Sequence, residues 1–273
     1  MTPLWGTVAI LAALGLLMAG VRGLQADDRI SPEIARKTVH VGMGVISFPL
    51  PWIFPDPRPI WLVAILVVFL FLAVRAVPAL ADRIGGVLGG VSRVSLGEIY
   101  YPLGAAIAFS QAHRTPVVFC VAMSVLAFGD TAGAVVGTRW GRWRYAMPGG
   151  IKSVEGSLAM LVISIACVSG ALVAWDNEAW KAALAGGFFV GIIAMIVEAV
   201  SCRGLDNLFL PVVVVGLIEL WIAQAERQRW IIVSLVLAVA LFFVLAVVAN
   251  AVARRRGDAG RIWSHGDSPA DNS

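Results

Sequence analysis

Apolar stretches of membrane-crossing length, separated by short charged or Pro/Gly-rich breaks, run along almost the whole chain. A helix needs about 20 mostly apolar residues to cross the hydrocarbon core of a bilayer. The pattern predicts spans at approximately 4–21, 38–54, 59–78, 98–111, 116–137, 157–175, 181–200, 207–223 and 230–252. The fourth span is short and two prolines interrupt the second, so either can be tilted, kinked or re-entrant. We therefore expect an all-α transmembrane bundle of about nine spans.

The composition excludes a soluble enzyme as the main architecture. Hydrophobic residues make up 59% of the 273 residues and charged residues 14%, which leaves no room for a separate Rossmann, TIM-barrel or P-loop domain. We expect one transmembrane catalytic domain over 1–253 and a polar, disordered tail over 254–273. A net charge of +4 is too small and scattered for a nucleic-acid partner. The three cysteines form no CxxC pair and predict neither a disulfide framework nor a zinc site.

The basic residues are distributed unevenly between the two sides of the predicted bundle. With nine spans, 16 of the 21 Lys and Arg residues fall on one side and five on the other. Because cytoplasmic loops carry the excess of positive charge, this asymmetry places the amino terminus outside and the carboxyl-terminal tail in the cytoplasm. We expect an integral protein of a bacterial-type inner (plasma) membrane.

Acidic residues within or beside the apolar runs are candidates for function, because each charge costs a few kcal/mol to place there. Five of the six lie near predicted cytoplasmic ends of spans, namely Glu98, Asp130, Glu155, Glu198 and Asp206. Glu219 lies toward the opposite end of its span, where snorkelling or a structural hydrogen bond explains it better. The five therefore form a candidate layer at one membrane surface.

Cations flank the same layer at the start of the second span. In Arg36-Lys37-x-x-His40, helical spacing puts Arg36 and His40 on one face, which would direct both toward one pocket. The alternative is a positive-inside flank with an interfacial histidine. The acids predicted opposite this segment favour the pocket.

A long predicted cytoplasmic loop, 137–157, contains three arginines, Lys152 and five glycines. It is a candidate phosphate cradle, because glycines let the backbone approach an anion and a helix beginning near Ser153 would offer free N–H groups. It is not a Walker A loop, since Ile151 occupies the glycine position before Lys-Ser. The alternative is lipid-headgroup binding by the arginines with Trp140 and Trp143.

Two further positions carry alternatives of their own. Asp130 is surrounded by small residues, Gly129-Asp130-Thr-Ala-Gly133, so another helix or a ligand can come close. A buried structural Asp paired with an Arg is the other interpretation. Asp206-Asn207, before Pro211, offers a carboxylate and an amide at a helix start, where N-capping is the structural alternative.

Carboxylates beside Lys and Arg at a water-reachable membrane surface suit Mg²⁺-dependent phosphoryl transfer, because acids hold the metal and cations neutralise phosphate oxygens. No GxSxG, HExxH or Cys/His pattern indicates another chemistry. The catalytic candidates are Asp130, Lys152 and Glu98. The metal candidates are Asp130, Glu98, Glu198 and Asp206. The nucleotide-binding candidates are Arg36, Lys37, His40, Lys152, Ser153, Gly156, Asp206 and Asn207.

Five ordered segments between about 33 and 215 resemble the integral-membrane lipid-alcohol kinases, which include dolichol kinase, phytol kinase and fungal CTP-dependent diacylglycerol kinase. They are Arg36-Lys37-x-x-His40, Gly97-Glu98-Ile-Tyr-Tyr-Pro102, Gly129-Asp130-Thr-Ala-Gly-Ala-Val-Val-Gly137, Lys152-Ser153-Val-Glu155-Gly156-Ser157, and Glu198 followed by Asp206-Asn207-x-x-x-Pro211. The resemblance implies CTP as phosphoryl donor, a lipid-alcohol acceptor (phytol, geranylgeraniol, a polyprenol or dolichol, or diacylglycerol) and a lipid phosphate product. It covers most of the predicted membrane domain.

Two other functions fit parts of the pattern. Membrane cytidylyltransferases that make CDP-diacylglycerol are similar in outline, but their Pro-Gly-His-Gly-Gly segment is absent here. A lipid transporter would need polar groups toward mid-membrane and often has repeated halves. The charges lie at one surface and no internal repeat is evident, so we favour the enzyme.

Overall fold

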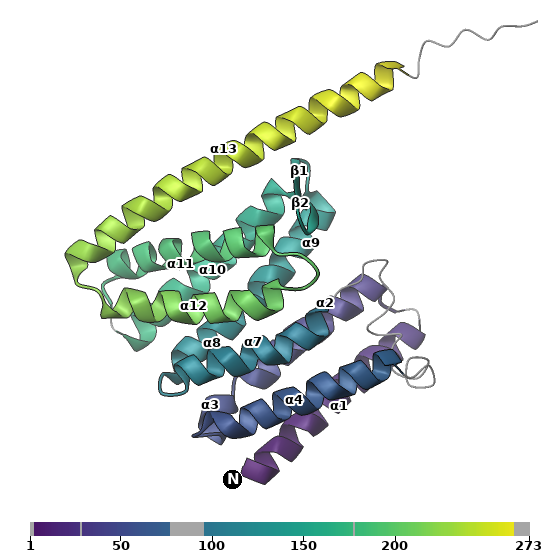
Figure 1. The fold of residues 1–273 in the computed structure, drawn as a ribbon, viewed down its shortest axis with the longest axis vertical. Helices are drawn as coiled ribbons and strands as arrows, with labels where there is room; N and C mark the ends of the chain where they lie inside the picture. The colour runs from purple at the N-terminus through teal and green to yellow at the C-terminus, as the bar shows by residue number, and fades with distance from the viewer. Residues whose placement is uncertain (1–2, 28, 77–95, 177, 265–273) are drawn as a thin grey trace, which may run out of the picture.

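The computed structural model describes residues 3–27, 29–76, 96–176 and 178–264, and this part is almost entirely helical (Figure 1). The helices of the first half are α1 (Pro3–Ala26), α2 (Pro32–Ser47), α3 (Leu50–Ile53), α4 (Pro57–Ala76), α7 (Gly97–Ala112) and α8 (Pro116–Ser124). A π-helical segment, η2 (Val125–Gly129), leads into α9 (Asp130–Trp140). The strands β1 (Arg144–Met147) and β2 (Gly150–Ser153) precede α10 (Val154–Trp175), α11 (Trp180–Val200), α12 (Asp206–Ala223) and α13 (Glu226–Ser264).

Over its described residues, each predicted span is wholly or largely helical. The second span is divided between α2 and α3 near Pro49. In the described part, six helices are long and apolar enough to cross a membrane, and Pro57–Ala73 is a shorter apolar helix. α2 and α7 have 16 residues each. The helical membrane architecture is thus confirmed, and six of the described helices fit a span by length and composition, while nine crossings stay a prediction.

A continuous helix made of α8, η2 and α9 lies inside the bundle. It runs from Pro116 to Trp140, and its α8 part is packed on nearly every side, with Phe119, Ala122 and Met123 fully buried. This helix contacts α2, α7, α10 and α12. In contrast, α13 and the outer sides of α1 and α4 expose many large apolar side chains, as expected of surfaces that face lipid.

Small residues on α9 bring α10 unusually close. A methyl group at Gly156 would lie 2.6 Å from the Gly133 carbonyl oxygen, and one at Gly129 would lie 2.6 Å from the Met160 sulfur. Both distances are shorter than van der Waals contact. The small residues around Asp130 predicted that a helix or a ligand comes close. The neighbour is the helix α10, and its packing against Gly129 fixes the position of the adjacent Asp130.

The predicted loop 137–157 contains an antiparallel hairpin, in which Tyr145 pairs with Lys152. The Ala146 N–H donates to Asn250 Oδ1 of α13 at 3.0 Å, and Figure 1 shows α13 reaching the hairpin. α13 continues to Ser264. Residues 254–264 are thus helical, which differs from the expected disordered tail, and 265–273 lie outside the described residues.

Candidate functional site

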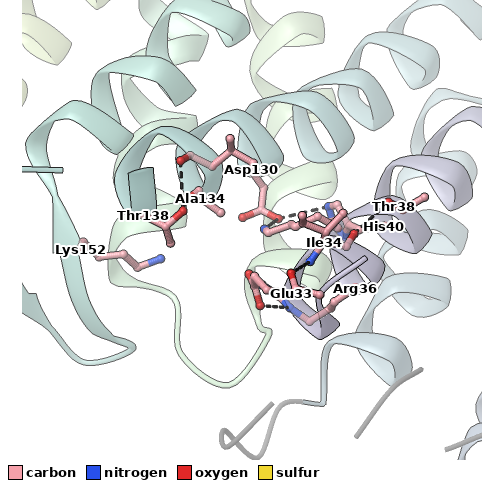
Figure 2. A network of polar contacts seen from close by, with 12 residues as sticks. Glu33, Ile34, Arg36, Thr38, His40, Asp130, Ala134, Thr138 and Lys152 are labelled. Carbon is pink, nitrogen blue, oxygen red and sulfur yellow. Dashed lines mark hydrogen bonds and ion pairs between the residues drawn. The ribbon is translucent and has the colours of Figure 1, made fainter. Parts of the chain in front are cut away.

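Asp130 forms the centre of a buried charged cluster. Its Oδ2 lies 2.8 Å from Lys37 Nζ and 3.3 Å from His40 Nε2, and all three side chains are less than 10% exposed. Figure 2 shows Asp130 between the α2 side chains on one side and Lys152 on the other. The alternative interpretation predicted a buried Asp130 paired with an arginine. Asp130 is buried and paired, but its partner is Lys37.

The π-helical segment before Asp130 takes part in this arrangement. His40 Nε2 lies 3.1 Å from the carbonyl oxygen of Leu126, inside η2. Two oxygens therefore face the same ring nitrogen, which indicates that Nε2 carries the proton. Single-turn π segments are rare in proteins as a whole, and those that occur often lie at functional sites. No sequence pattern predicted this segment.

A second ion pair joins the hairpin to α11. Lys152 Nζ donates to a carboxylate oxygen of Glu198, and the lysine side chain is 26% exposed. Burial alone lowers the pKa of Lys152, but the Glu198 carboxylate outweighs burial and raises the pKa above its ordinary value. The ammonium group therefore stays charged and within reach of water, as a phosphate-binding cation must.

Asp206 and Asn207 lie at the start of α12 beside both ion pairs. The charge of Asp206 acts on Asp130, Lys152 and His40. Neither residue is the N-cap of α12. The N-cap is Leu205, and no side chain caps the helix with a hydrogen bond. Asn207 Oδ1 is buried and has no hydrogen-bond partner among the described residues. The capping alternative is thus not observed for either side chain.

A strained turn positions this end of α12. Arg203 has φ 53° and Gly204 has φ 89°, and the Arg203 carbonyl oxygen accepts from the Leu96 N–H at 2.9 Å. Left-handed backbone is uncommon for a residue other than glycine and clusters at functional sites. The turn links the starts of α7 and α12, so the two helices begin at the same end of the bundle.

The glycines of loop 137–157 pack against the chain and do not form an open cradle. Methyl groups at Gly137 and Gly141 would lie 2.9 and 2.7 Å from Ser153 Oγ, and one at Gly149 would lie 2.1 Å from the Ser201 carbonyl oxygen. Gly150 has φ 122°, which side-chain-bearing residues rarely adopt. The glycines therefore fix the hairpin against α9 and the α11–α12 turn.

The predicted helix start near Ser153 is confirmed, but its N–H groups are partly used within the protein. Ser153 is the N-cap of α10 and its Oγ accepts from the Gly156 N–H at 3.1 Å. Glu155 accepts from the N–H groups of Arg142 and Trp143. Ser153 and Gly156 are both buried. These contacts position Lys152, whereas direct nucleotide contact by Ser153 and Gly156 stays a prediction.

Arg36 and Glu98 lie at the edge of the cluster. Arg36 pairs with Glu33 at 2.7 Å, and its side chain is 42% exposed. Lys37 and His40, and not Arg36 and His40, thus share the face that contacts Asp130. Glu98 lies in the first turn of α7 and is half-buried.

Among the described residues, no three His, Cys, Asp or Glu side chains form a ready-made metal cage. Asp130 is bonded to Lys37 and Glu198 to Lys152, so within the described ranges Asp206 is the carboxylate of the cluster without a lysine partner at bonding distance. Mg²⁺ in phosphoryl-transfer enzymes usually takes one or two carboxylates, with waters and substrate phosphates completing the shell. The arrangement fits such an ion and does not fit an all-protein site.

The cluster combines a buried carboxylate, a protonatable ring, a half-buried ammonium group and an acid at a helix start, all at one end of the bundle. Such a set can bind a polyphosphate and accept a proton from an alcohol. The structure brings six of the predicted site residues together, namely Lys37, His40, Asp130, Lys152, Glu198 and Asp206, and it pairs Arg36 with Glu33. It adds Leu126, which no recognised pattern singled out, and it packs the ring of Tyr101, from the Gly97–Pro102 segment, against His40.

One comparison with curated proteins is informative. Over 214 residues, the chain is 32% identical to a protein named phytol kinase from Synechocystis sp.. The aligned region covers 77% of this chain and 88% of that protein. No protein-family model matches the chain, and no solved structure matches it.

Proposed function

Because the chain belongs to the membrane lipid-alcohol kinase family that includes phytol kinase, we propose that it transfers the terminal phosphoryl group of CTP to a lipid alcohol. The family membership makes it a kinase that acts on an alcohol group. The acceptor we propose is an isoprenoid alcohol such as phytol, geranylgeraniol or a polyprenol, with diacylglycerol as the other candidate. The product is the corresponding lipid phosphate.

The observation that carries this proposal is the cluster of Asp130, Lys37, Lys152, Glu198 and Asp206 at one end of a lipid-embedded bundle. Isolated charges are expensive in such a fold, and here they converge from helices and a hairpin that are far apart in the sequence. We assign Lys152 to the triphosphate, with Arg36 as a second cation at the water-exposed edge. Both side chains are partly exposed.

We assign Mg²⁺ to Asp206, with Asp130 as the second carboxylate. When bound, the ion neutralises charge on the phosphate oxygens and orients the terminal phosphoryl group. Asn207 lies beside Asp206 and offers its unpaired Oδ1 to a water or nucleotide hydroxyl. Glu98 and Glu198 remain alternative candidates for binding Mg²⁺. Glu198 also pairs with Lys152, which keeps the ammonium group charged and in place.

The reaction forms a bond between the lipid hydroxyl oxygen and the terminal phosphorus and breaks the bond from that phosphorus to its bridging oxygen. The nucleoside diphosphate leaves with the bridging electron pair. The hydroxyl proton passes to the Asp130–His40 pair, where the Nε2 hydrogen bond to Leu126 orients the ring. Lys152 stabilises the charge that grows on the leaving phosphate.

We place the site at the cytoplasmic face of a bacterial inner membrane, with the amino terminus outside. The basic asymmetry of the loops supports this orientation. A cytosolic nucleotide and a membrane-dissolved alcohol can then meet without either crossing the bilayer.

The decisive experiment supplies purified protein in lipid vesicles with CTP, ATP or UTP labelled at the γ- or α-phosphate, together with a panel of lipid alcohols. We expect label from γ-labelled CTP in a lipid monophosphate and none from α-labelled CTP. Transfer of α-label into a CDP-lipid would indicate a cytidylyltransferase. No transfer to any lipid, with an Asp130→Asn preparation as the blank, would contradict a kinase assignment.

A further inference from the structure

A pocket between α1, α2, α4 and α7 lies next to the charged cluster. Its wall is almost entirely hydrocarbon, contributed among others by Leu14, Met43, Val67 and Ala105. Behind the wall, the neighbouring residues of α4, such as Leu66, are exposed on the outside of the bundle, where lipid surrounds a membrane protein. A molecule in this pocket is therefore mostly apolar and enters from the bilayer.

The pocket also has a polar end, formed by Tyr101 and Ser47. Tyr101 is 4% exposed, and its Oη has no well-formed hydrogen bond within the described parts of the chain. Ser47 is the polar neighbour of the phenol, but its own hydroxyl donates to the Gly44 carbonyl oxygen at 2.6 Å. A buried phenol without a partner is unfavourable in a resting protein. A ligand hydroxyl at this position would satisfy it.

Tyr101 connects this polar end to the proposed phosphoryl-transfer site. Its ring packs edge-on against the ring of His40, with centroids 5.5 Å apart and planes at 83°. His40 in turn contacts Asp130. Thus one aromatic ring separates the polar end of the pocket from the charged cluster. An alcohol held there has its reactive end toward the phosphate-binding groups and its tail toward the membrane interior.

We propose that this pocket binds the hydrocarbon chain of the lipid-alcohol substrate, with the substrate hydroxyl against Tyr101 Oη and next to His40. The assignment rests on the proposed kinase function and identifies where its acceptor lies. Acceptor specificity is then set by the shape of the wall formed by α2, α4 and α7. An acyl chain of a bulk phospholipid is the competing occupant, and it would make no use of the Tyr101 hydroxyl.

Tyr101→Phe tests the polar end, because it removes only the unpaired hydroxyl. We expect the apparent KM for the alcohol to rise about tenfold, the factor that corresponds to one hydrogen bond of ordinary strength. The KM for nucleotide and the thermal unfolding temperature should not fall, since no internal hydrogen bond is lost. An unchanged KM for the alcohol would overturn the contact.

Val67→Phe tests the apolar wall, with Leu66→Phe as its matched control. Val67 is 9% exposed and lines the pocket, whereas Leu66 is 47% exposed on the outer side of the same helix. Displacing even two methylene groups of a bound chain weakens binding about tenfold. We expect that loss for a twenty-carbon alcohol with Val67→Phe, a smaller loss for a short-chain alcohol, and no loss with Leu66→Phe. Equal effects of the two changes would overturn the pocket.

Photolabelling separates failure of this inference from failure of the proposed function. The probe is a twenty-carbon isoprenoid alcohol that carries a diazirine near its hydroxyl group. Labelling of α2 and α7 peptides that unlabelled alcohol prevents, and that Val67→Phe reduces, supports the pocket even if no phosphoryl donor is found. Catalytically active protein that is labelled only on α13 would retain the kinase function and overturn the pocket.

Discussion

Lys37 Nζ lies 2.8 Å from Asp130 Oδ2, although 93 residues separate them in the sequence, and both side chains are more than nine-tenths buried. Removing one partner of a buried pair leaves an uncompensated charge, which is far more damaging than replacing both. The pair therefore has a structural effect and, in the proposed mechanism, a chemical one. The two effects can be separated by mutation.

Asp130→Asn should lower turnover about 100-fold or more and destabilise the protein by about 3–5 kcal/mol. Adding Lys37→Met removes the stranded charge, so the double variant should recover much of the stability and none of the turnover. Thermal unfolding in detergent and γ-label transfer measure the two quantities. Recovery of turnover in the double variant would reduce Asp130 to a structural role.

Lys152→Ala should weaken nucleotide binding by about 1.5–3 kcal/mol, the scale of a charge-assisted hydrogen bond. Arg142→Ala is the control, because Arg142 lies in the same loop, is exposed, and bonds Glu155 through its backbone N–H. The nucleotide KM is the readout. If the loop binds lipid headgroups instead, Lys152→Ala will have little effect and activity will follow the anionic-lipid content of the vesicles.

Asp206→Asn should raise the Mg²⁺ concentration needed for half-maximal activity about tenfold or more, because it removes the carboxylate assigned to the ion. Glu219→Gln, near the other end of α12, provides the matched control and should leave the metal requirement unchanged. The measurement is a Mg²⁺ titration after chelator treatment at saturating nucleotide. A wild-type titration curve for Asp206→Asn would assign the ion to other residues.

Gly156→Ala should destabilise the protein by about 1–3 kcal/mol, the usual range for overpacking a buried contact. The added methyl group would lie 2.6 Å from the Gly133 carbonyl oxygen. Gly170 is on the same helix with nothing within 4 Å of a new methyl group, so Gly170→Ala should be neutral or slightly stabilising. Thermal unfolding compares the two. Equal effects would show that α9 and α10 pack too loosely for a methyl group at Gly156 to matter.

Single cysteines in a Cys-free background test the orientation in the membrane. Ile151 and Gln228 are both exposed and lie toward opposite sides of the predicted bundle. In intact cells, Gln228→Cys should react with an impermeant thiol reagent, and Ile151→Cys should react only after permeabilisation. Labelling of Ile151→Cys from outside would reverse the orientation and place the site away from cytosolic nucleotide.

Local properties of the sequence were sufficient for the general architecture. The lengths of the apolar runs predict nine helical segments, and the described part of each is largely helical. The physical reason is that a chain in lipid must satisfy its backbone hydrogen bonds within the segment. The cost of burying charge likewise identifies Asp130, Glu198 and Asp206 from their positions in or beside the apolar runs. Six of the described helices have the length and apolar composition of a span, whereas α2 and α7, with 16 residues each, are shorter.

Only the tertiary structure decided which groups meet. Helical spacing put Arg36 beside His40, but the packing of α2 against η2 turns Lys37 toward Asp130 and leaves Arg36 at the edge. The loop glycines suggested a phosphate cradle, yet their neighbours are Ser153 and Ser201. Such contacts depend on how helices from distant parts of the chain rotate and approach one another. The periodicity and composition of a single segment contain no information about that rotation, so the partners of a buried charge become known only when the helices are packed together.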